Sequence, residues 1–333
     1  MSNEYYIWLH EKRGLSNRRK KELLELHKSP IAVFEELDGT REELEGARRL
    51  ESFHEKLGIK LLRMDDPGFI PPAKQNNNTP ILLYYKGVIE TQQKRSVAIV
   101  GSRKATLYGM SVAQLACNEY ARNGHRILSG LAKGIDSVVH RTALDAGAVT
   151  YGFLANGLND CYPKENSELM AEIIETGAVL SSFPADTPPI RQNFYSRNEI
   201  MVTWADDIII AEAGEKSGAL LTGKLALKNN RKLFIVPNSI FAPGSAGSNR
   251  LLQSGALPFL GAPEKTQSRR DDKVTLKPRA DLIELLDITP LTTEELSHRL
   301  QRDSELLQSN LLSLELEDLV RFHPDGKWHS NGH

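Results

Sequence analysis

The segment Ser217–Leu225, SGALLTGKL, contains two glycines and a lysine spaced almost as in a nucleotide-binding P-loop. In a P-loop, Gly-x-x-x-x-Gly-Lys-[Ser/Thr], backbone N–H groups and the lysine hold the phosphates, and the final hydroxyl binds magnesium. Leu225 occupies the hydroxyl position, and it follows Leu221 by four residues, as on the apolar face of a helix. We therefore expect Ser217 and Gly218 to open a helix whose N–H groups face an anion, without ATP turnover.

Small and polar residues also follow the other short apolar runs in the middle of the chain. These runs are VAIV (97–100), RIL (126–128), VTYGFL (149–154), AVLSS (178–182), DIIIA (207–211) and LFIVP (233–237). The residues that follow these runs are glycines, small hydroxyls, amides and cations, with one aromatic ring. Glycine lets backbone N–H groups approach an anion. The candidate binding residues are Gly101, Ser102, Arg103, Ser129, Gly130, Lys133, Gly157, Lys164, Phe194, Arg197, Asn198, Ser217, Gly218 and Asn249.

The same runs predict the elements that position these residues. The runs lack polar alternation and are joined by amphipathic stretches of helical length, which indicates parallel strands buried on both faces. Right-handed crossovers then give an α/β fold, an extended Rossmann-like, doubly wound parallel sheet over residues 96–260. Because ligands bind beyond the carboxyl ends of such strands, the candidate residues should meet at one edge that suits phosphates.

The rest of the 333-residue chain predicts smaller units around this domain. Residues 1–60 are predicted to form a helical domain, and residues 61–95 an irregular connecting segment that leads into a short strand, ILLYYKG. Residues 261–278 are polar and lack apolar periodicity, which is typical of a linker. Residues 279–330 contain three helical stretches and a hairpin-like end, which predicts a winged-helix-like module.

Composition limits the classes of partner. The formal net charge of −1 gives no general attraction to nucleic acid or membrane, so any polyanion site must be a local patch. The two cysteines are far apart in sequence, which argues against a disulfide framework and suits a reducing cytosol. No stretch approaches the roughly 20 apolar residues of a membrane span, and the N-terminal residues do not resemble a secretory signal. We expect a cytoplasmic protein.

Other chemistries find less support in the sequence. The turn after the first parallel strand is GSRKATLYG rather than Gly-x-Gly-x-x-Gly, which argues against a dinucleotide site. His140 stands alone in its predicted helix, so we expect no metal and no other cofactor. An enzyme or sensor for a small nucleotide stays open as the alternative, and it would need a carboxylate at the edge. The acids near the edge are Asp136, Asp160, Glu165 and Glu212, each of which also fits a helix start or a sheet edge.

Six strings in this region resemble the DNA-processing protein DprA family, also called Smf. The strings are VAIVGSRKATLYG, ILSGLAKGIDSVVHRTAL, LANGLNDCYPKENSEL, FPADTPPIRQNFYSRNEI, IIIAEAGEKSGALLTGKLAL and GSNRLLQSGA, and they follow the family's order over residues 97–256. The helical N-terminus resembles the family's sterile-alpha-motif-like (SAM-like) domain. The tail resembles its winged helix.

The resemblance implies binding of single-stranded DNA without catalysis, in natural transformation (competence) and DNA recombination. It implies that the protein protects incoming single strands, helps to load RecA recombinase on them, and forms a homodimer through the Rossmann-like domain. It also implies that Arg103 and Lys164 contact DNA, with the glycine turns and the pairs 197–198 and 217–218 in the same pocket. Single-strand binding requires cations along the phosphates and sequence-tolerant contacts to bases, for which Phe194 is a candidate.

The sequence departs from the family's pattern at Asn156, Ser182, Glu199 and Asn238. The family has an acid where Ser182 stands and a cation where Glu199 stands. We interpret this double change as the loss of a structural ion pair that leaves DNA binding intact.

Two helices carry notable charge patterns. The basic run at 18–21 predicts either a solvated helix face or contact with a phosphate backbone. The tail helix SELLQSNLLSLELEDL contains Glu305, Glu315, Glu317 and Asp318 and no cation, so facing DNA would cost affinity. We therefore expect it to bind protein or to pack within the module.

Overall fold

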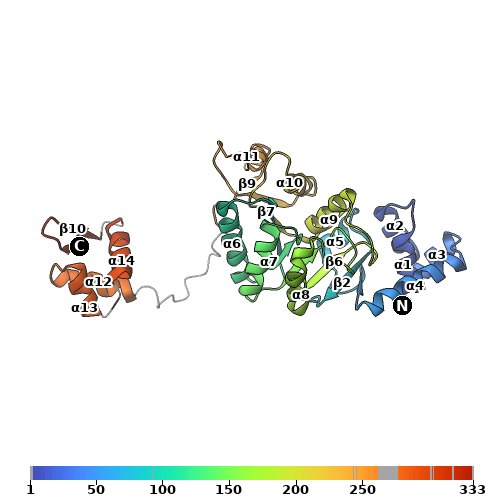
Figure 1. Cartoon of the computed structure of the whole chain (residues 1–333), viewed down its shortest axis with the longest axis horizontal. Helices are drawn as coiled ribbons and strands as arrows, with labels where there is room; N and C mark the ends of the chain where they lie inside the picture. Colours follow the sequence, from blue (N-terminus) through green and yellow to red (C-terminus); the bar gives the residue numbers. More distant parts are fainter. Residues whose placement is uncertain are drawn as a thin grey trace. The chain divides into compact units, whose positions relative to one another are not determined.

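The computed structural model describes residues 3–92, 94–242, 244, 246–261, 277–300, 302, 304–316 and 319–331. The chain divides into two compact units, residues 1–262 and 263–333 (Figure 1). Residues 262–276 of the predicted linker lie outside the described residues, and Lys277 already begins a helix. No helix in the described ranges is long and apolar enough to cross a membrane.

A sheet of nine strands, counted over the described residues, forms the centre of the first unit, in the order β1-β2-β6-β5-β4-β3-β7-β8-β9. Strands β3 to β9 run parallel, whereas β1 and β2 pair antiparallel at one edge. This confirms the predicted doubly wound α/β fold. The strands are β1 (Lys60–Arg63), β2 (Leu82–Gly87), β3 (Ser96–Val100), β4 (Arg126–Ser129), β5 (Thr150–Phe153), β6 (Ala178–Ser181), β7 (Asp207–Ile210), β8 (Lys232–Ile235) and β9 (Leu257–Pro258).

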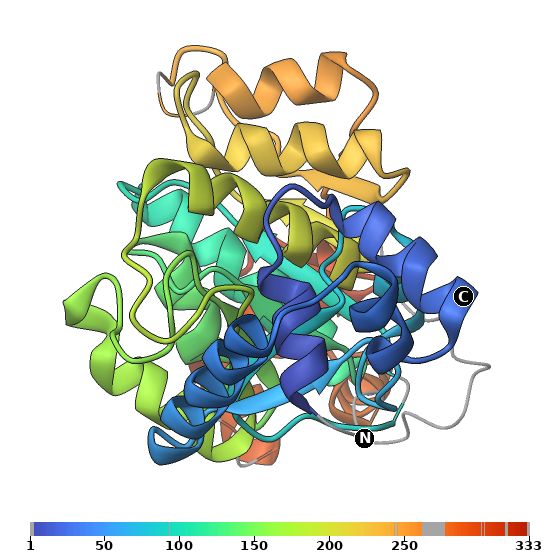
Figure 2. The ribbon, with the colours of Figure 1, turned by 90° about the vertical axis from the view of Figure 1, so that its right-hand side faces the viewer.

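Helices cover both faces of the sheet because alternate strand residues point to opposite sides. On β3, Val97 and Ile99 pack with α6 and α7, whereas Ala98 and Val100 pack with α9 and α10. Figure 2 shows α10 and α11 side by side over the β8–β9 end. The helices of this part are α6 (Leu107–Arg122), α7 (Ile135–Asp145), the short 3-10 helix η1 (Lys164–Asn166), α8 (Ser167–Thr176), α9 (Arg191–Trp204), α10 (Gly218–Lys228) and α11 (Ala246–Gln253).

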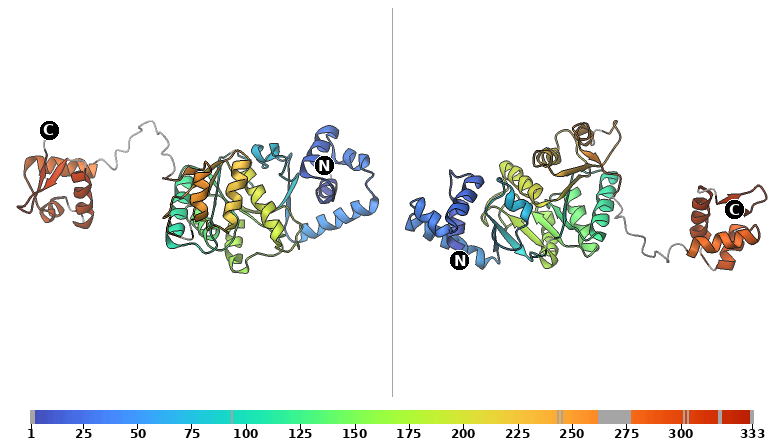
Figure 3. Two further views of the ribbon diagram at one scale, coloured as in Figure 1. Left: turned by 90° about the horizontal axis from the view of Figure 1, so that it is seen from above. Right: turned by 180° about the vertical axis from the view of Figure 1, so that it is seen from behind.

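Four helices precede the sheet and gather beside its antiparallel edge (Figure 3). They are α1 (Asn3–Glu11), α2 (Asn17–His27), α3 (Pro30–Glu36) and α4 (Arg41–Lys56). Three of them begin at hydroxyl caps, and Thr40 forms a full capping box with Glu43 at the start of α4. Their apolar faces share one core with the sheet, in which Trp8 and Leu9 are buried together with Tyr84 and Val179.

The segment 61–95 is more than the irregular connection that its sequence predicts. It contains most of β1, the short helix α5 (Pro71–Gln75) and the expected strand β2. Strand β2 pairs with β6, so the sheet begins well before residue 96. The strand β1 has four residues, KLLR, which is too short for a period of two to be recognised.

The basic run at 18–21 fits neither of its two predicted roles as a whole. Lys20 and Lys21 are buried, and the ammonium of Lys21 donates to the main-chain oxygens of Lys74 (3.1 Å) and Asn76 (2.6 Å). These carbonyls lie at the end of α5, so the lysine joins α2 to the sheet domain, and its burial lowers the pKa of Lys21 to about 8. Only Arg18 and Arg19 form an exposed face, where both pair with a glutamate of the same helix.

The second unit is a winged helix. It consists of α12 (Lys277–Ile288), α13 (Thr293–Leu300), α14 (Ser304–Leu316) and the hairpin β10 (Val320–Phe322) and β11 (Trp328–Ser330). Leu307, Leu311 and Leu314 of the acidic helix α14 are buried at helical spacing in the core of the module. Glu315 accepts the N–H of Phe322, whereas the acids at 317 and 318 lie outside the described residues.

Candidate nucleic-acid interface

The strands that follow β3 are added on one side of it, whereas β7 and the strands after it are added on the other side. A doubly wound fold binds its ligand at this point, where the strand order reverses. The chain leaves β3 toward one face and β7 toward the other, and a cleft of about 1260 Å³ opens beyond their carboxyl ends. Eight of the fourteen predicted binding residues line it: Gly101, Ser102, Arg103, Phe194, Arg197, Asn198, Ser217 and Gly218. These eight residues come from three separate strings of the sequence and meet in one cleft, as the strand pattern predicts.

A side pocket of about 70 Å³ adjoins the cleft and shares Arg103, Phe194 and Arg197 with it. Gly130 and Lys133, which follow β4, also line this pocket. Ten of the fourteen predicted residues thus lie in one continuous site. The exposed ammonium of Lys133 pairs with the carboxylate of Glu165 at 2.6 Å, so part of its charge is already balanced.

The other four predicted residues line neither cavity. Ser129 is fully buried and donates its hydroxyl to the main-chain oxygen of Ile99, which holds β4 against β3. A Cβ on Gly157 would lie 2.0 Å from the main-chain oxygen of Pro184, so glycine is needed there for close packing. Asn249 donates to the main-chain oxygen of Asn238 at 3.2 Å, and Lys164 is an exposed cation in η1. Their contact with DNA stays a prediction, and a fully buried hydroxyl such as that of Ser129 can act only by positioning its neighbours.

Arg197 holds the floor of the cleft together from a buried position. Its guanidinium donates to the main-chain oxygen of Phe153 at 2.6 Å and to that of Gly130, and its Nε donates to Asn198 Oδ1 at 2.8 Å. It therefore ties the ends of β4 and β5 to α9. Burial lowers the pKa of Arg197 to about 10, although the nearby Asp136 carboxylate acts in the opposite direction. At neutral pH the guanidinium remains charged beneath the site.

The ring of Phe194 contacts two cations. The guanidinium carbons of Arg103 and Arg197 lie 5.1 and 5.8 Å from the centre of its ring, within the range of a cation–π contact. The ring of Tyr162 meets it edge-on at 6.0 Å between centroids. Arg103 is exposed, so Phe194 supports a cation that faces the cleft.

The start of α10 has the form expected from its sequence. Ser217 caps the helix and accepts the N–H of Ala219 at 3.2 Å, and Gly218 is exposed at the first turn. Leu225 is only 2% exposed and belongs to the core between α10 and the sheet. The P-loop resemblance is therefore a coincidence of spacing, and what remains is a helix N-terminus that opens into the cleft.

Three cations that the sequence reasoning missed complete the cleft: Lys104, Arg191 and Lys216, all exposed. Each adjoins a predicted residue, since Lys104 follows GSR, Lys216 precedes SG and Arg191 lies one helical turn before Phe194. Among the described lining residues the one carboxylate belongs to Asp136, and its burial raises the pKa of that group. The lining of the cleft is therefore strongly cationic.

The positions that depart from the family's pattern have partners of their own. The carboxylate of Glu199 accepts from Asn78 Nδ2 at 2.8 Å, and the main-chain oxygen of Ser182 lies 2.9 Å from His10 Nε2. Asn156 donates to the main-chain oxygen of Asp160 at 2.7 Å. Positions 182 and 199 thus contact different N-terminal segments, and the idea that they once formed an ion pair stays a hypothesis.

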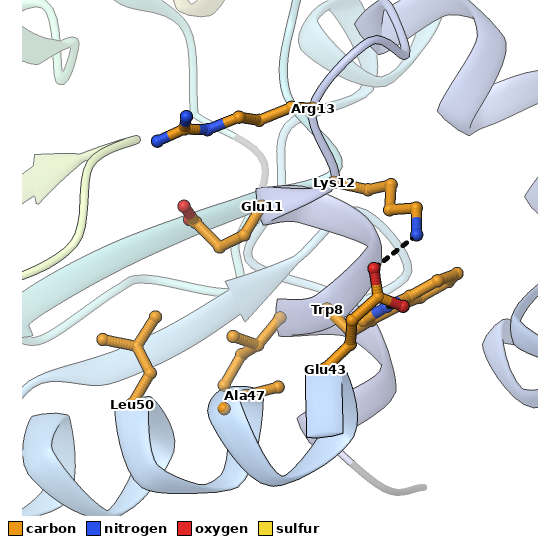
Figure 4. A pocket seen from close by; sticks show the side chains of 9 residues that line it. Trp8, Glu11, Lys12, Arg13, Glu43, Ala47 and Leu50 are labelled. Atoms are coloured by element: carbon orange, nitrogen blue, oxygen red, sulfur yellow. Dashed lines mark hydrogen bonds and ion pairs between the residues drawn. The ribbon is translucent and has the colours of Figure 1, made fainter. Parts of the chain in front are cut away.

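A second cavity, of about 450 Å³, lies between α1 and α4 (Figure 4). The ammonium of Lys12 pairs with Glu43 at 2.6 Å, and Trp8 Nε1 donates to the same carboxylate at 3.1 Å. The hydrogen bond from Lys12 is the main reason that the pKa of Glu43 falls to about 2. None of the predicted binding residues lines this cavity, and its cation–carboxylate pair leaves little charge for a polyanion.

No group of three potential metal ligands occurs within the residues that the structure describes. His140 is buried in α7, and its Nδ1 lies 2.7 Å from Thr150 Oγ1. Burial lowers the pKa of His140 to about 3, so the imidazole is neutral.

Comparison with known proteins identifies the two units. A family model described as DNA recombination-mediator protein A matches residues 60–268, and one described as DprA winged helix domain matches residues 264–326. Protein Smf of Escherichia coli is 36% identical over 198 residues, which cover 59% of this chain and 53% of that protein. DNA processing protein DprA of Bacillus subtilis is 33% identical over 231 residues, which cover 65% of this chain and 78% of that protein. The match thus spans about half of the E. coli protein.

Solved structures of two relatives resemble the chain. DNA processing protein A of Streptococcus pneumoniae superposes with a TM-score of 0.66 at 29% identity, covering 77% of this chain and 94% of that one. A Helicobacter pylori DNA processing protein A, whose structure is described as revealing a unique single-stranded DNA binding mode, gives a TM-score of 0.54 at 30% identity and covers 61% of this chain and 91% of that one. These matches agree with the strand order of the first unit and with the winged helix of the second. The chain belongs to the DNA recombination-mediator protein A family, whose relatives are named DprA or Smf.

Proposed function

We propose that the chain binds single-stranded DNA along the cleft at the carboxyl edge of the sheet. The observation that carries this proposal is the concentration of exposed cations, Arg103, Lys104, Arg191 and Lys216, around a cleft whose one described carboxylate is buried. In a chain with a net charge of −1, such a patch is a local attractor for a polyanion.

The dimensions of the cleft favour a strand over a single nucleotide. Pockets for small molecules measure roughly 300–1,000 Å³, and this cleft of about 1260 Å³ continues into a side pocket. Exposed cations can follow successive phosphates, and the N-terminus of α10 offers further N–H groups. Such contacts do not depend on base sequence, so we expect binding without strong sequence preference.

We infer that the site acts without catalysis. Of the four acids considered for a nucleotide enzyme, only Asp136 lines the cleft, and it is buried beside Arg197. Glu165 pairs with Lys133, and Glu212 accepts the main-chain N–H of Thr106 at the start of α6. A catalytic carboxylate would need access to substrate, and these three are already engaged in structural contacts.

The cellular role that we propose follows from the family. The chain would protect incoming single strands and help to load RecA recombinase on them during natural transformation and recombination. The H. pylori relative, described as a single-stranded DNA binder, supports the binding step.

We also propose a homodimer through the Rossmann-like domain. Ile240, Phe241 and Leu260 are 81%, 88% and 82% exposed, and Leu257 of the edge strand β9 is 50% exposed. Leu257 lies in β9 and Leu260 follows it directly, whereas Ile240 and Phe241 lie in the loop between β8 and α11. Exposed apolar residues at a sheet edge favour pairing with another chain, and a second copy would cover them.

The test is single-strand binding measured at several salt concentrations, with a duplex of equal length for comparison. Arg103→Glu and Lys164→Glu should each lower the affinity by about tenfold or more and make its salt dependence shallower by roughly one phosphate contact. Arg122→Glu, an exposed cation at the far end of α6, is the matched control and should change little. If the variants at Arg103 and Lys164 both bind as tightly as the wild type, the proposal is wrong.

A further inference from the structure

The aromatic rings around the cleft differ in how much of their surface is free. The half-buried ring of Phe194 already contacts the guanidinium groups of Arg103 and Arg197 and the edge of Tyr162. In contrast, Tyr162 and Tyr195 are 45% and 41% exposed. A base that stacks on Phe194 would have to displace a neighbour, whereas the two tyrosines can receive one directly.

We propose that Tyr162 and Tyr195 make the stacking contacts with the bases of a bound single strand, and that Phe194 instead positions Arg103. This inference rests on the proposed function, because it assigns the base contacts of the same site. Stacking on an aromatic ring is tolerant of sequence since every base has a flat π-face.

Tyr195 lies on the side of α9 that faces the cleft. It follows Arg191 by four residues, which places both on the same stripe of the helix, and both line the cleft. A cation and an exposed ring thus lie next to each other. This pair suits a DNA strand, in which each phosphate is followed by a base. Asn198, a turn beyond, extends the same surface.

Tyr162 stands at the side pocket, which exposed cations also line. It lines this pocket with Arg103 and Lys133, and the exposed Lys164 follows two residues later. The volume of this pocket, about 70 Å³, is far below the roughly 300–1,000 Å³ of pockets that enclose small molecules. A base at this position must therefore stay outside the pocket, against the exposed part of the Tyr162 ring.

Phe194 has a different task in this arrangement. The cation–π contact at 5.1 Å limits the rotamers of Arg103 and keeps its guanidinium above the floor of the cleft. A phosphate would then meet a cation that is already ordered. Phe194 is a positioning residue, and its loss should resemble a partial loss of Arg103.

The experiment compares two strands of equal length, one with bases and one with abasic residues throughout, using the full chain. Alanine replacement of a stacking ring typically costs from about 5-fold to 150-fold in affinity. We expect Tyr162→Ala and Tyr195→Ala each to lower affinity for the base-bearing strand about tenfold and to leave the abasic strand unchanged. Tyr162→Phe and Tyr195→Phe should restore binding to within about twofold. Phe53→Ala, which removes an exposed ring of α4, is the control and should affect neither strand.

Phe194→Ala gives the second arm. This variant should weaken binding of both strands equally and make the salt dependence of binding shallower, as Arg103→Glu does, because Phe194 acts through the Arg103 cation. A loss confined to the base-bearing strand for Phe194→Ala, with none for the tyrosine variants, would overturn the inference and make Phe194 the stacking ring. Equal losses on both strands for the tyrosine variants would also overturn it. If the wild-type chain binds neither strand, the proposed function itself fails, which is a distinct result.

Discussion

Replacing Leu225 by serine would complete the P-loop pattern Gly-x-x-x-x-Gly-Lys-Ser and provides a sharp test of the structure. Leu225 is 2% exposed and packs in the core between α10 and the sheet, with Leu233 and Leu251 in the same cluster. Truncating a buried leucine to alanine costs about 2–5 kcal/mol. A serine hydroxyl can bond back to the carbonyl one turn earlier, here that of Leu221, so it adds little to that cost. We expect Leu225→Ser to lose about 3–4 kcal/mol.

Thermal unfolding and nucleotide binding together measure this outcome. For a domain of 150–250 residues each kcal/mol shifts the midpoint by about 2–4 °C, so the first unit should melt roughly 6–16 °C lower. Leu225→Met, which conserves the volume, is the matched control and should cost less than about 1.5 kcal/mol. Neither variant should bind ATP with magnesium, as followed by calorimetry or by a fluorescent nucleotide.

One result would refute the reasoning. If Leu225→Ser keeps its stability and gains magnesium-dependent ATP binding, position 225 faces a phosphate site and the segment is a decayed P-loop. The leucine would then be a lost ligand position rather than a core residue.

Four further predictions address other parts of the chain. Gly157→Ala should lower the melting temperature by several degrees because its Cβ meets a main-chain oxygen at 2.0 Å, whereas Gly218→Ala, with nothing within 4 Å, should fold normally. The pKa of Lys21 is lowered from 10.5 to about 8 in the fold, so the unfolded chain binds more protons between these values and stability should rise with pH across that window. The wild-type minus Lys21→Met difference in urea midpoint isolates this contribution, and a difference that does not vary with pH would contradict it. Leu260→Arg should convert the proposed dimer to a monomer in light scattering, and an unchanged dimer mass would place the interface elsewhere. Deleting residues 279–333 should leave single-strand affinity within about threefold, since the acidic α14 offers few phosphate contacts, and a larger loss would give the winged helix a direct role.

The parallel strands and the cleft were predictable because they depend on local patterns. Each inner strand is an apolar run, and topology alone brings Arg103 and Ser217 to the same edge. Lys21 shows the limit of this reasoning. A lysine in a basic run is predicted to be exposed, and only the folded chain shows that main-chain oxygens surround its ammonium. The same limit applies to Phe194, since only the folded chain brings two guanidinium groups over its ring. Arg191 could have been predicted as a binding residue, because its helical spacing from Phe194 is visible in the sequence.

The core shared by the N-terminal helices and the sheet has a consequence for synthesis of the protein on the ribosome. Trp8 and Leu9 emerge well before Tyr84 and Val179, which help to bury them. At about 5–20 residues per second, the ribosome needs roughly 10–35 s to pass from the first helix to β6. During that interval the apolar side of the leading helices has no complete partner, so this end of the nascent chain is where a holding chaperone would be needed most.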